Sequence, residues 1–234
     1  MAKKIKAPKV KKPIYKRVWF WIVVVIIVAA VGSGLGGGSS DDDKSDDADT
    51  TKSTSKSSSS KSVASSSSKK DDGKITRAQF DAIKIGDLMQ QASDGVTLEE
   101  LTKTFGKPAS TTSSTTNDVK TDIITWTNVE GGFGANVVVG FTNNHAFSKN
   151  ITGFKFSRSK KITLADFNAI ATGAAYQDVV NKIGEPDGLD ETLIGGSKTV
   201  IASYLSGVKG DLGANFNVTF TDDKVSGKTQ SSME

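Results

Sequence analysis

The 234-residue sequence predicts an α+β protein with an N-terminal transmembrane helix, a disordered linker, and two tandem modules. Each module is expected to contain two short helices packed on an antiparallel sheet. Three observations predict this organisation. An apolar run follows a strongly basic N-terminus, a polar low-complexity stretch follows the run, and three sequence blocks then recur in the same order.

The apolar run 18–31 is the first predicted element. Its fourteen residues span about 21 Å as a helix, and uncharged residues up to Gly38 extend this to about 31 Å, which matches a hydrocarbon core of about 30 Å. Eight Lys and Arg residues and no acidic residue precede it, in the tail 1–17. This bias predicts a cytoplasmic tail 1–17, a transmembrane signal-anchor over 18–38, and an extracytoplasmic remainder at the bacterial plasma membrane.

A cleaved signal peptide is the alternative interpretation of the same segment. The apolar run is short enough for one, and the small residues Ala30 and Gly32 stand where a signal peptidase would recognise them. The mature protein would then be secreted. We favour the single-pass anchor, because a long spacer after the segment is useful only on a tether.

The spacer covers residues 39–74 and consists almost entirely of Ser, Thr, Asp and Lys. Such a composition cannot bury enough apolar surface to offset the entropy of ordering, so we expect a disordered linker. A flexible coil of this length has a reach of about 33 Å. The linker would therefore hold the C-terminal part near the outer face of the membrane.

Charge and composition exclude several function classes. Residues after Gly32 carry 22 basic and 26 acidic side chains, a net charge of −4, so no electrostatic footprint for nucleic acid is present. The absence of cysteine excludes disulfides and a thiol nucleophile. With one histidine and no cysteine, the usual ligands of a zinc site are also lacking, and we expect neither a metal nor a cofactor.

An internal duplication organises the rest of the chain into modules over 75–158 and 159–234. Three pairs of blocks correspond: 75–83 with 162–170, 105–108 with 183–186, and 134–142 with 213–221. The offset between copies changes from 87 to 78 and 79. The first copy therefore carries about nine extra residues around 85–94.

Each copy is predicted to begin with two helices and continue with strands. Thr76 with Gln79, and Thr97 with Glu100, form capping boxes that open helices, and the Gly-x-Pro motifs after Phe105 and Ile183 end the second helices. Apolar and polar residues then alternate as in half-buried strands. The inward-facing residues are expected to be Val137, Val139 and Phe141 in the first copy and Ala214, Phe216, Val218 and Phe220 in the second.

The segments Leu-Thr-Lys-Thr-Phe-Gly-Lys-Pro108 and Val-Val-Asn-Lys-Ile-Gly-Glu-Pro186, each followed by an antiparallel sheet, carry a family resemblance. The chain from about Ile75 onward resembles the tandem-repeat family of the β-lactamase inhibitor protein, especially uncharacterised surface proteins of Gram-positive bacteria. The same module is similar to small outer-membrane assembly lipoproteins. The resemblance implies two modules side by side, with a concave sheet surface that binds protein. The cysteines of the secreted inhibitor are missing, and no inhibitory residue is carried over.

No catalytic residue set is apparent in the sequence. His145 stands beside a predicted hairpin turn, no nucleophile elbow surrounds a serine, and the acids Asp187, Asp190 and Glu191 follow Pro186 as in a solvated loop. The equivalent aromatics of the two copies are the candidate binding residues. These are Trp126 and Tyr204, which are either anchors on an open sheet face or core residues of a shared strand.

The sequence therefore suggests a non-catalytic, membrane-tethered protein-binding module of the bacterial cell envelope whose partner is an unknown protein or envelope component. One alternative is an assembly or structural factor with a permanent partner. An envelope hydrolase and a β-lactamase inhibitor are the remaining alternatives, and a polar pocket around His145 would favour the hydrolase.

Overall fold

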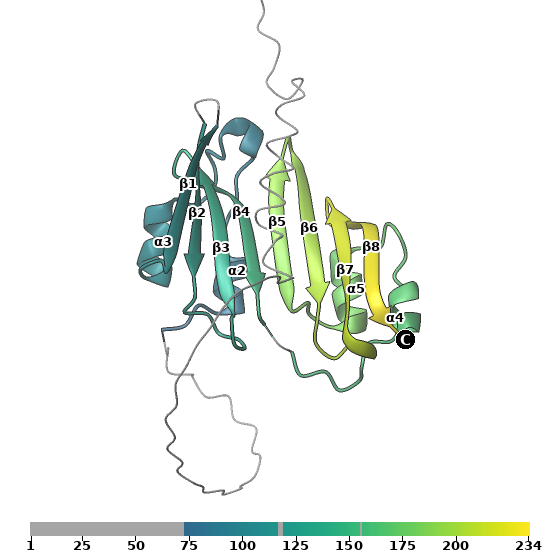
Figure 1. Cartoon of the computed structure of the whole chain (residues 1–234). Helices are drawn as coiled ribbons and strands as arrows, with labels where there is room; N and C mark the ends of the chain where they lie inside the picture. Colours follow the sequence, from purple (N-terminus) through teal and green to yellow (C-terminus); the bar gives the residue numbers. More distant parts are fainter. Residues whose placement is uncertain (1–72, 117–118, 155) are drawn as a thin grey trace, which may run out of the picture.

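The computed structural model describes residues 73–116, 119–154 and 156–234, which form one antiparallel eight-stranded sheet with its strands in chain order (Figure 1). The helical elements are α2 (Arg77–Asp81), the short 3₁₀ helix η2 (Leu88–Gln90), α3 (Leu98–Phe105), α4 (Leu164–Asn168) and α5 (Tyr176–Ile183). The strands are β1 (Ser110–Thr116), β2 (Val119–Trp126), β3 (Asn136–Thr142), β4 (His145–Thr152), β5 (Gly188–Ile194), β6 (Ser197–Tyr204), β7 (Gly210–Thr221) and β8 (Lys224–Met233).

The predicted fold class, with two tandem helix-plus-sheet modules, is wrong, because a single sheet runs through both copies of the repeat. Strands β4 and β5 pair directly, from Ser148 opposite Thr192 to Ile151 opposite Leu189. Two separate sheets would each leave a hydrogen-bonding edge exposed at this point. Pairing removes both edges and buries Ile151 and Leu189 in one continuous core.

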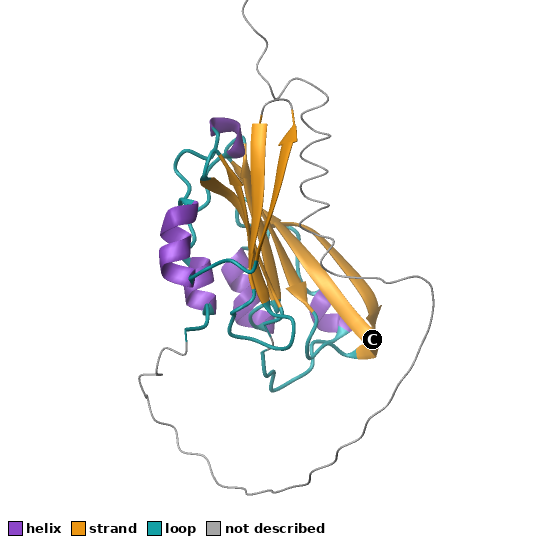
Figure 2. Ribbon diagram, turned by 60° about the vertical axis from the view of Figure 1, so that its left-hand side comes forward, coloured by secondary structure: helices purple, strands orange, loops and turns teal. Residues whose placement is uncertain are grey.

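The predicted local signals place the helices correctly. Thr76 and Thr97 both form complete capping boxes at the starts of α2 and α3. Gly106 and Gly184 end α3 and α5 with φ of +78° and +89°, values that an L-residue side chain rarely tolerates. The described helices all lie on one face of the sheet (Figure 2).

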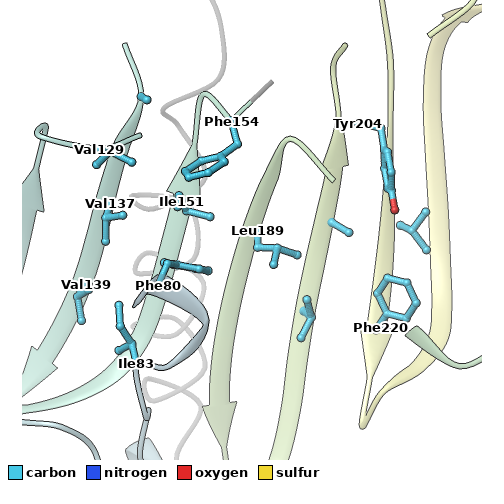
Figure 3. Close-up of a cluster of buried hydrophobic side chains, with 14 of the residues drawn as sticks. Phe80, Ile83, Val129, Val137, Val139, Ile151, Phe154, Leu189, Tyr204 and Phe220 are labelled. Carbon is cyan, nitrogen blue, oxygen red and sulfur yellow. The ribbon is translucent and has the colours of Figure 1, made fainter. Parts of the chain in front are cut away.

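One row of side chains across the sheet shows how this helix-covered face forms the core. The row runs Trp126, Val137, Ile151, Leu189, Ala202, Val218 and Lys228 from β2 to β8, and its apolar members are at most 4% exposed. Figure 3 shows several of these side chains together with Phe80, Ile83 and Phe220. Alternation along the strands confirms the predicted inward residues of β3 and β7.

The first-copy insertion connects the two halves of the molecule. Asp87 lies in it, and its carboxylate accepts hydrogen bonds from the backbone N–H groups of Gly195 (2.8 Å) and Gly196 (2.7 Å) in the β5–β6 turn. The same carboxylate accepts the Met89 N–H at 2.8 Å, which opens η2. The insertion in the first copy is thus hydrogen-bonded to the β5–β6 hairpin of the second copy.

The predicted cytoplasmic tail 1–17, transmembrane segment 18–38 and linker up to residue 72 lie outside the described residues. Within the described part of the chain, no helix is both long and apolar enough to cross a bilayer.

Candidate protein-binding surface

The two predicted binding residues, Trp126 and Tyr204, lie in the core. Trp126 is 1% exposed and Tyr204 is fully buried. The Trp126 indole Nε1–H donates to the Gly106 carbonyl oxygen at 3.0 Å, and the Tyr204 hydroxyl donates to the Gly184 carbonyl oxygen at 3.1 Å. Each ring therefore joins the last turn of a helix to the sheet in its own copy. Neither side chain is accessible to a partner in this structure, and their role is packing.

Two other apolar side chains are fully exposed at equivalent positions of the repeat. Phe133, between β2 and β3, and Leu212, at the irregular start of β7, each have a relative accessibility of 105%. The β2–β3 connection that carries Phe133 and the β6–β7 connection next to Leu212 lie at the same end of the sheet (Figure 1). A large apolar side chain that a folded domain leaves entirely in water is informative when it recurs at a second, equivalent site. We name this pair the loop tips.

The local sequence holds both loop tips in the same way. Each is followed by Gly-Ala-Asn, and the glycines have positive φ, +80° at Gly134 and +88° at Gly213. The next residue is a buried alanine, and the asparagine amide then closes the turn. Asn136 Nδ2 donates to the Gly134 carbonyl at 3.0 Å, and Asn215 Nδ2 donates to the Gly213 carbonyl at 2.7 Å. An ordered turn therefore presents each tip, which lowers the entropy lost when a partner binds.

The second part of the candidate surface is the sheet face that no described helix covers, which we name the open face. A single row crosses it through all eight strands, in the order Ser110, Thr125, Val138, Asn150, Asp190, Ile201, Thr219 and Gly227. From Thr125 onward, these residues are all half-buried. The row has apolar Val138 and Ile201 on either side of a polar centre, a composition suited to contact with another protein.

Asp190 forms the polar centre of the open face, at the junction of the two copies. Its carboxylate accepts a long hydrogen bond, 3.4 Å, from the Asn150 side-chain amide, and it has no ion pair among the described residues. Burial raises the pKa of this carboxyl group to about 6. Buried carboxyl groups with a perturbed pKa gather at functional sites, so Asp190 is a candidate contact residue of the open face.

The predicted solvated acidic loop after Pro186 is wrong. Asp187 is 2% exposed and is tied to the backbone N–H groups of Leu205 and Ser206 at 2.7 and 2.8 Å, and Glu191 is buried on β5. His145 begins β4 and contacts the Gly95 carbonyl oxygen through Nδ1 at 2.9 Å. In the described residues, no group of three or more His, Cys, Asp and Glu side chains could hold a metal ion.

The domain of unknown function DUF3862, a family with a solved structure, matches residues 72–233. The chain belongs to this family. The match covers the whole sheet and both pairs of helices, so the DUF3862 domain of this chain is the eight-stranded unit described above. None of the curated proteins compared with the chain matches it.

A solved structure supports the same fold for this DUF3862 domain. A Streptococcus mutans protein, described as a candidate beta-lactamase inhibitor protein, matches with a TM-score of 0.57 and 27% sequence identity. The match covers 68% of this chain and 96% of the S. mutans chain. The fold resemblance to the β-lactamase inhibitor protein, predicted from the helix-Gly-x-Pro-sheet pattern, is therefore supported.

Sequence reasoning missed the loop tips of the DUF3862 domain. The signal was present, since Phe133 and Leu212 each stand alone among glycines and precede Gly-Ala-Asn at an offset of 79. A lone apolar residue in a loop is ordinary in one copy, but its recurrence at the same position of a repeat is not. Exposure itself depends on the tertiary structure and could not be read from the spacing.

Proposed function

We propose that this chain is a non-catalytic, membrane-tethered protein-binding module of the bacterial cell envelope, and that it binds its partner through the loop tips. The observation that carries the proposal is the complete exposure of Phe133 and Leu212 at equivalent, ordered turns. The tether is proposed on the sequence features of residues 18–38.

The loop tips have the properties of binding anchors. Aromatic and large aliphatic side chains that fill partner pockets contribute most of the affinity in many interfaces, and rigid presentation reduces the entropic cost. The two tips lie at the same end of one sheet, so a single partner can contact both at once. The open face beside them supplies a polar contact area, with Asp190 available to a basic partner group.

The test compares proteins retained from envelope extracts by the purified wild-type protein and by the double variant Phe133→Ser, Leu212→Ser. We expect a partner that the wild type retains and the double variant loses. Since loss of an anchor costs about 2 kcal/mol or more, the affinity for the purified partner should fall about 30-fold or more.

Val119→Ser is the matched control, because Val119 is also exposed, at 46%, but stands at the opposite end of β2. This variant should bind like the wild type. If the double variant retains the same proteins as the wild type, the loop tips are not the binding site. A substrate consumed by the purified protein would contradict the non-catalytic part of the proposal.

Inhibition of a β-lactamase is the second candidate function, and the likeness to the S. mutans protein is the observation that favours it. It is tested by following hydrolysis of a chromogenic cephalosporin by a purified β-lactamase in the presence of the chain. Inhibition that the double variant lacks would identify a β-lactamase as the partner of the loop tips. Undiminished hydrolysis by several β-lactamases would leave an envelope protein as the proposed partner.

A further inference from the structure

The two outer strands of the sheet, β1 and β8, are protected very differently against pairing with another strand. Strand β8 carries Lys224 and Lys228, and its pairing with β7 shifts register at two places. The Lys228 ammonium group also donates to three carbonyl oxygens at the end of α4, those of Phe167, Asn168 and Ile170, at 2.8–3.0 Å. Charged residues and bulges are the usual means of blocking a sheet edge.

Strand β1 has none of these protections. Its sequence is Ser-Thr-Thr-Ser-Ser-Thr-Thr, without charge or proline, and it pairs with β2 in one unbroken register over all seven residues. The side chains from Ser110 to Thr115 are exposed on both faces. In the described part of the chain, β1 has a strand neighbour on one side only. Its outer N–H and C=O groups therefore form a regular, accessible row.

The repeat shows that this edge can accept a strand. Strand β1 corresponds to β5 at an offset of 78, and the matching edge of β5 is occupied by β4 in antiparallel pairing. In the second copy, the helices therefore do not block the edge of β5 that corresponds to the outer edge of β1. At the outer edge of β1, that place is taken by no described strand of the same chain.

We propose that β1 is a self-association edge, and that its occupant is β1 of a second copy of this chain in antiparallel, two-fold symmetric pairing. An uncharged strand meets its own copy without like-charge repulsion, and Ser and Thr pairs across strands form hydrogen bonds. The two-fold contact closes after two copies. This inference stands apart from the proposed protein-binding function, because the loop tips are not involved.

Strand β8 of a second copy fits this edge less well. The internal β4–β5 junction is held by Ile151 against Leu189 and by the Lys149–Glu191 ion pair at 3.5 Å. On the outer strand β8, Gln230 stands at the position of Ile151. On β1, Thr111 and Ser113 stand at the positions of Leu189 and Glu191, so neither the apolar contact nor the ion pair could form. Head-to-tail pairing would also leave free edges at each end and continue without limit.

Pairing of two seven-residue polar strands buries little apolar surface, so the association should be weak. Single cysteines in the full-length chain detect such contacts well, because the natural sequence has no cysteine. Pairing of all seven residues places Ser113 opposite itself and Thr112 opposite Ser114 of the second copy. We expect oxidation to give disulfide-linked dimers for Ser113→Cys, and for a mixture of Thr112→Cys and Ser114→Cys.

Thr229→Cys on β8 is the matched control and should give no dimer. The double variant Thr112→Lys, Ser114→Lys should abolish crosslinking through Ser113→Cys, whereas Thr229→Lys should not affect it. Unchanged thermal unfolding would show that each variant folds. The proposal is overturned if no β1 cysteine crosslinks, if Thr112→Cys crosslinks only to Thr229→Cys, or if the β1 cysteines crosslink to a different protein.

Discussion

Trp126 and Tyr204 are equivalent residues that use different chemistry for the same purpose. Each ring is buried against the core, Trp126 edge-on to Phe105 at 5.6 Å and Tyr204 stacked on Phe216 at 4.5 Å. Each also satisfies the carbonyl of a helix-ending glycine. An indole N–H and a phenol O–H can substitute for one another here, because only one donor at the far end of a flat ring is required.

Trp126→Ala and Tyr204→Ala should each lower the free energy of unfolding by about 3–5 kcal/mol, because each leaves a large cavity and an unpaired helix-end carbonyl. Chemical denaturation measures the loss. Phe133→Ala is the control and should change stability by less than about 0.5 kcal/mol, since its ring contacts solvent only. A fully stable Tyr204→Ala protein would argue against the core assignment.

The burial of Asp190 should make the stability of the protein depend on pH. Its folded-state pKa, raised to about 6 from an ordinary 3.8, means that the folded protein binds this proton more tightly than the unfolded chain does. Stability should therefore rise as pH falls from 7 through 6 to about 4, by about 1–3 kcal/mol. Hydrogen bonds from Thr97 and Thr163 lower the pKa values of Glu100 and Asp166, so their opposite effects appear only at lower pH.

The variant Asp190→Asn should be more stable than the wild type at pH 7 and should lose the rise in stability between pH 7 and 4. Urea unfolding at several pH values measures this. Asp178→Asn, a change at an exposed carboxylate of α5, is the control and should keep the rise. If Asp190→Asn retains the wild-type pH profile, the carboxylate is not the group responsible.

At the scale of elements, glycine ends the second helix of each copy, and residues with positive φ form the tight turns between strands. Gly106 and Gly184 end α3 and α5, whereas the tight β3–β4 and β7–β8 turns use Asn143-Asn144 and Asp222-Asp223, all four with positive φ. Asn and Asp are the non-glycine residues that best tolerate this conformation, so these hairpins were predictable from sequence. The two copies of the repeat thus form equivalent tight turns from the related residue pairs Asn-Asn and Asp-Asp.

Gly184→Val should lower the unfolding free energy by about 1–3 kcal/mol, because a β-branched residue is strained at φ +89°. A Cβ at this position would also approach Arg158 Nη1 at 2.8 Å. At Gly106, φ is +78° but a Cβ would meet nothing within 4 Å, so Gly106→Ala reports the backbone strain alone, about 1 kcal/mol. Thermal unfolding of Gly184→Val that matches the wild type would mean that this glycine does not limit stability.

At the scale of the whole molecule, the two repeats are joined by more than the shared sheet. Asp87, in the first-copy insertion, is only 7% exposed. Its carboxylate accepts hydrogen bonds from the β5–β6 turn of the second copy. The β4–β5 ladder and this contact lie at the same junction between halves. The insertion that breaks the symmetry of the repeat therefore strengthens the connection between its copies.

Asp87→Ala should cost about 1–3 kcal/mol, the loss expected for charge-assisted hydrogen bonds to backbone donors. Hydrogen exchange should show the largest increase at Gly195 and Gly196. Asp94→Ala is the control in the same insertion, because the Asp94–Lys84 pair is exposed at 3.7 Å and should contribute less than about 0.5 kcal/mol. Unchanged exchange at the β5–β6 turn would show that Asp87 does not hold the two copies together.

The sequence by itself determined the local features of this protein: the duplicated blocks, the Thr97 capping box, the glycine helix ends, and the inward side of strands such as β7. These follow from interactions between residues close in the chain, whose spacing is visible in the sequence. Only the tertiary structure decided that β4 pairs with β5, that Asp187 and Glu191 are buried, and that Trp126 is core while Phe133 is exposed. Those outcomes depend on which strand edges meet and which face the helices cover, and contacts between distant segments leave no periodic signal in one sequence.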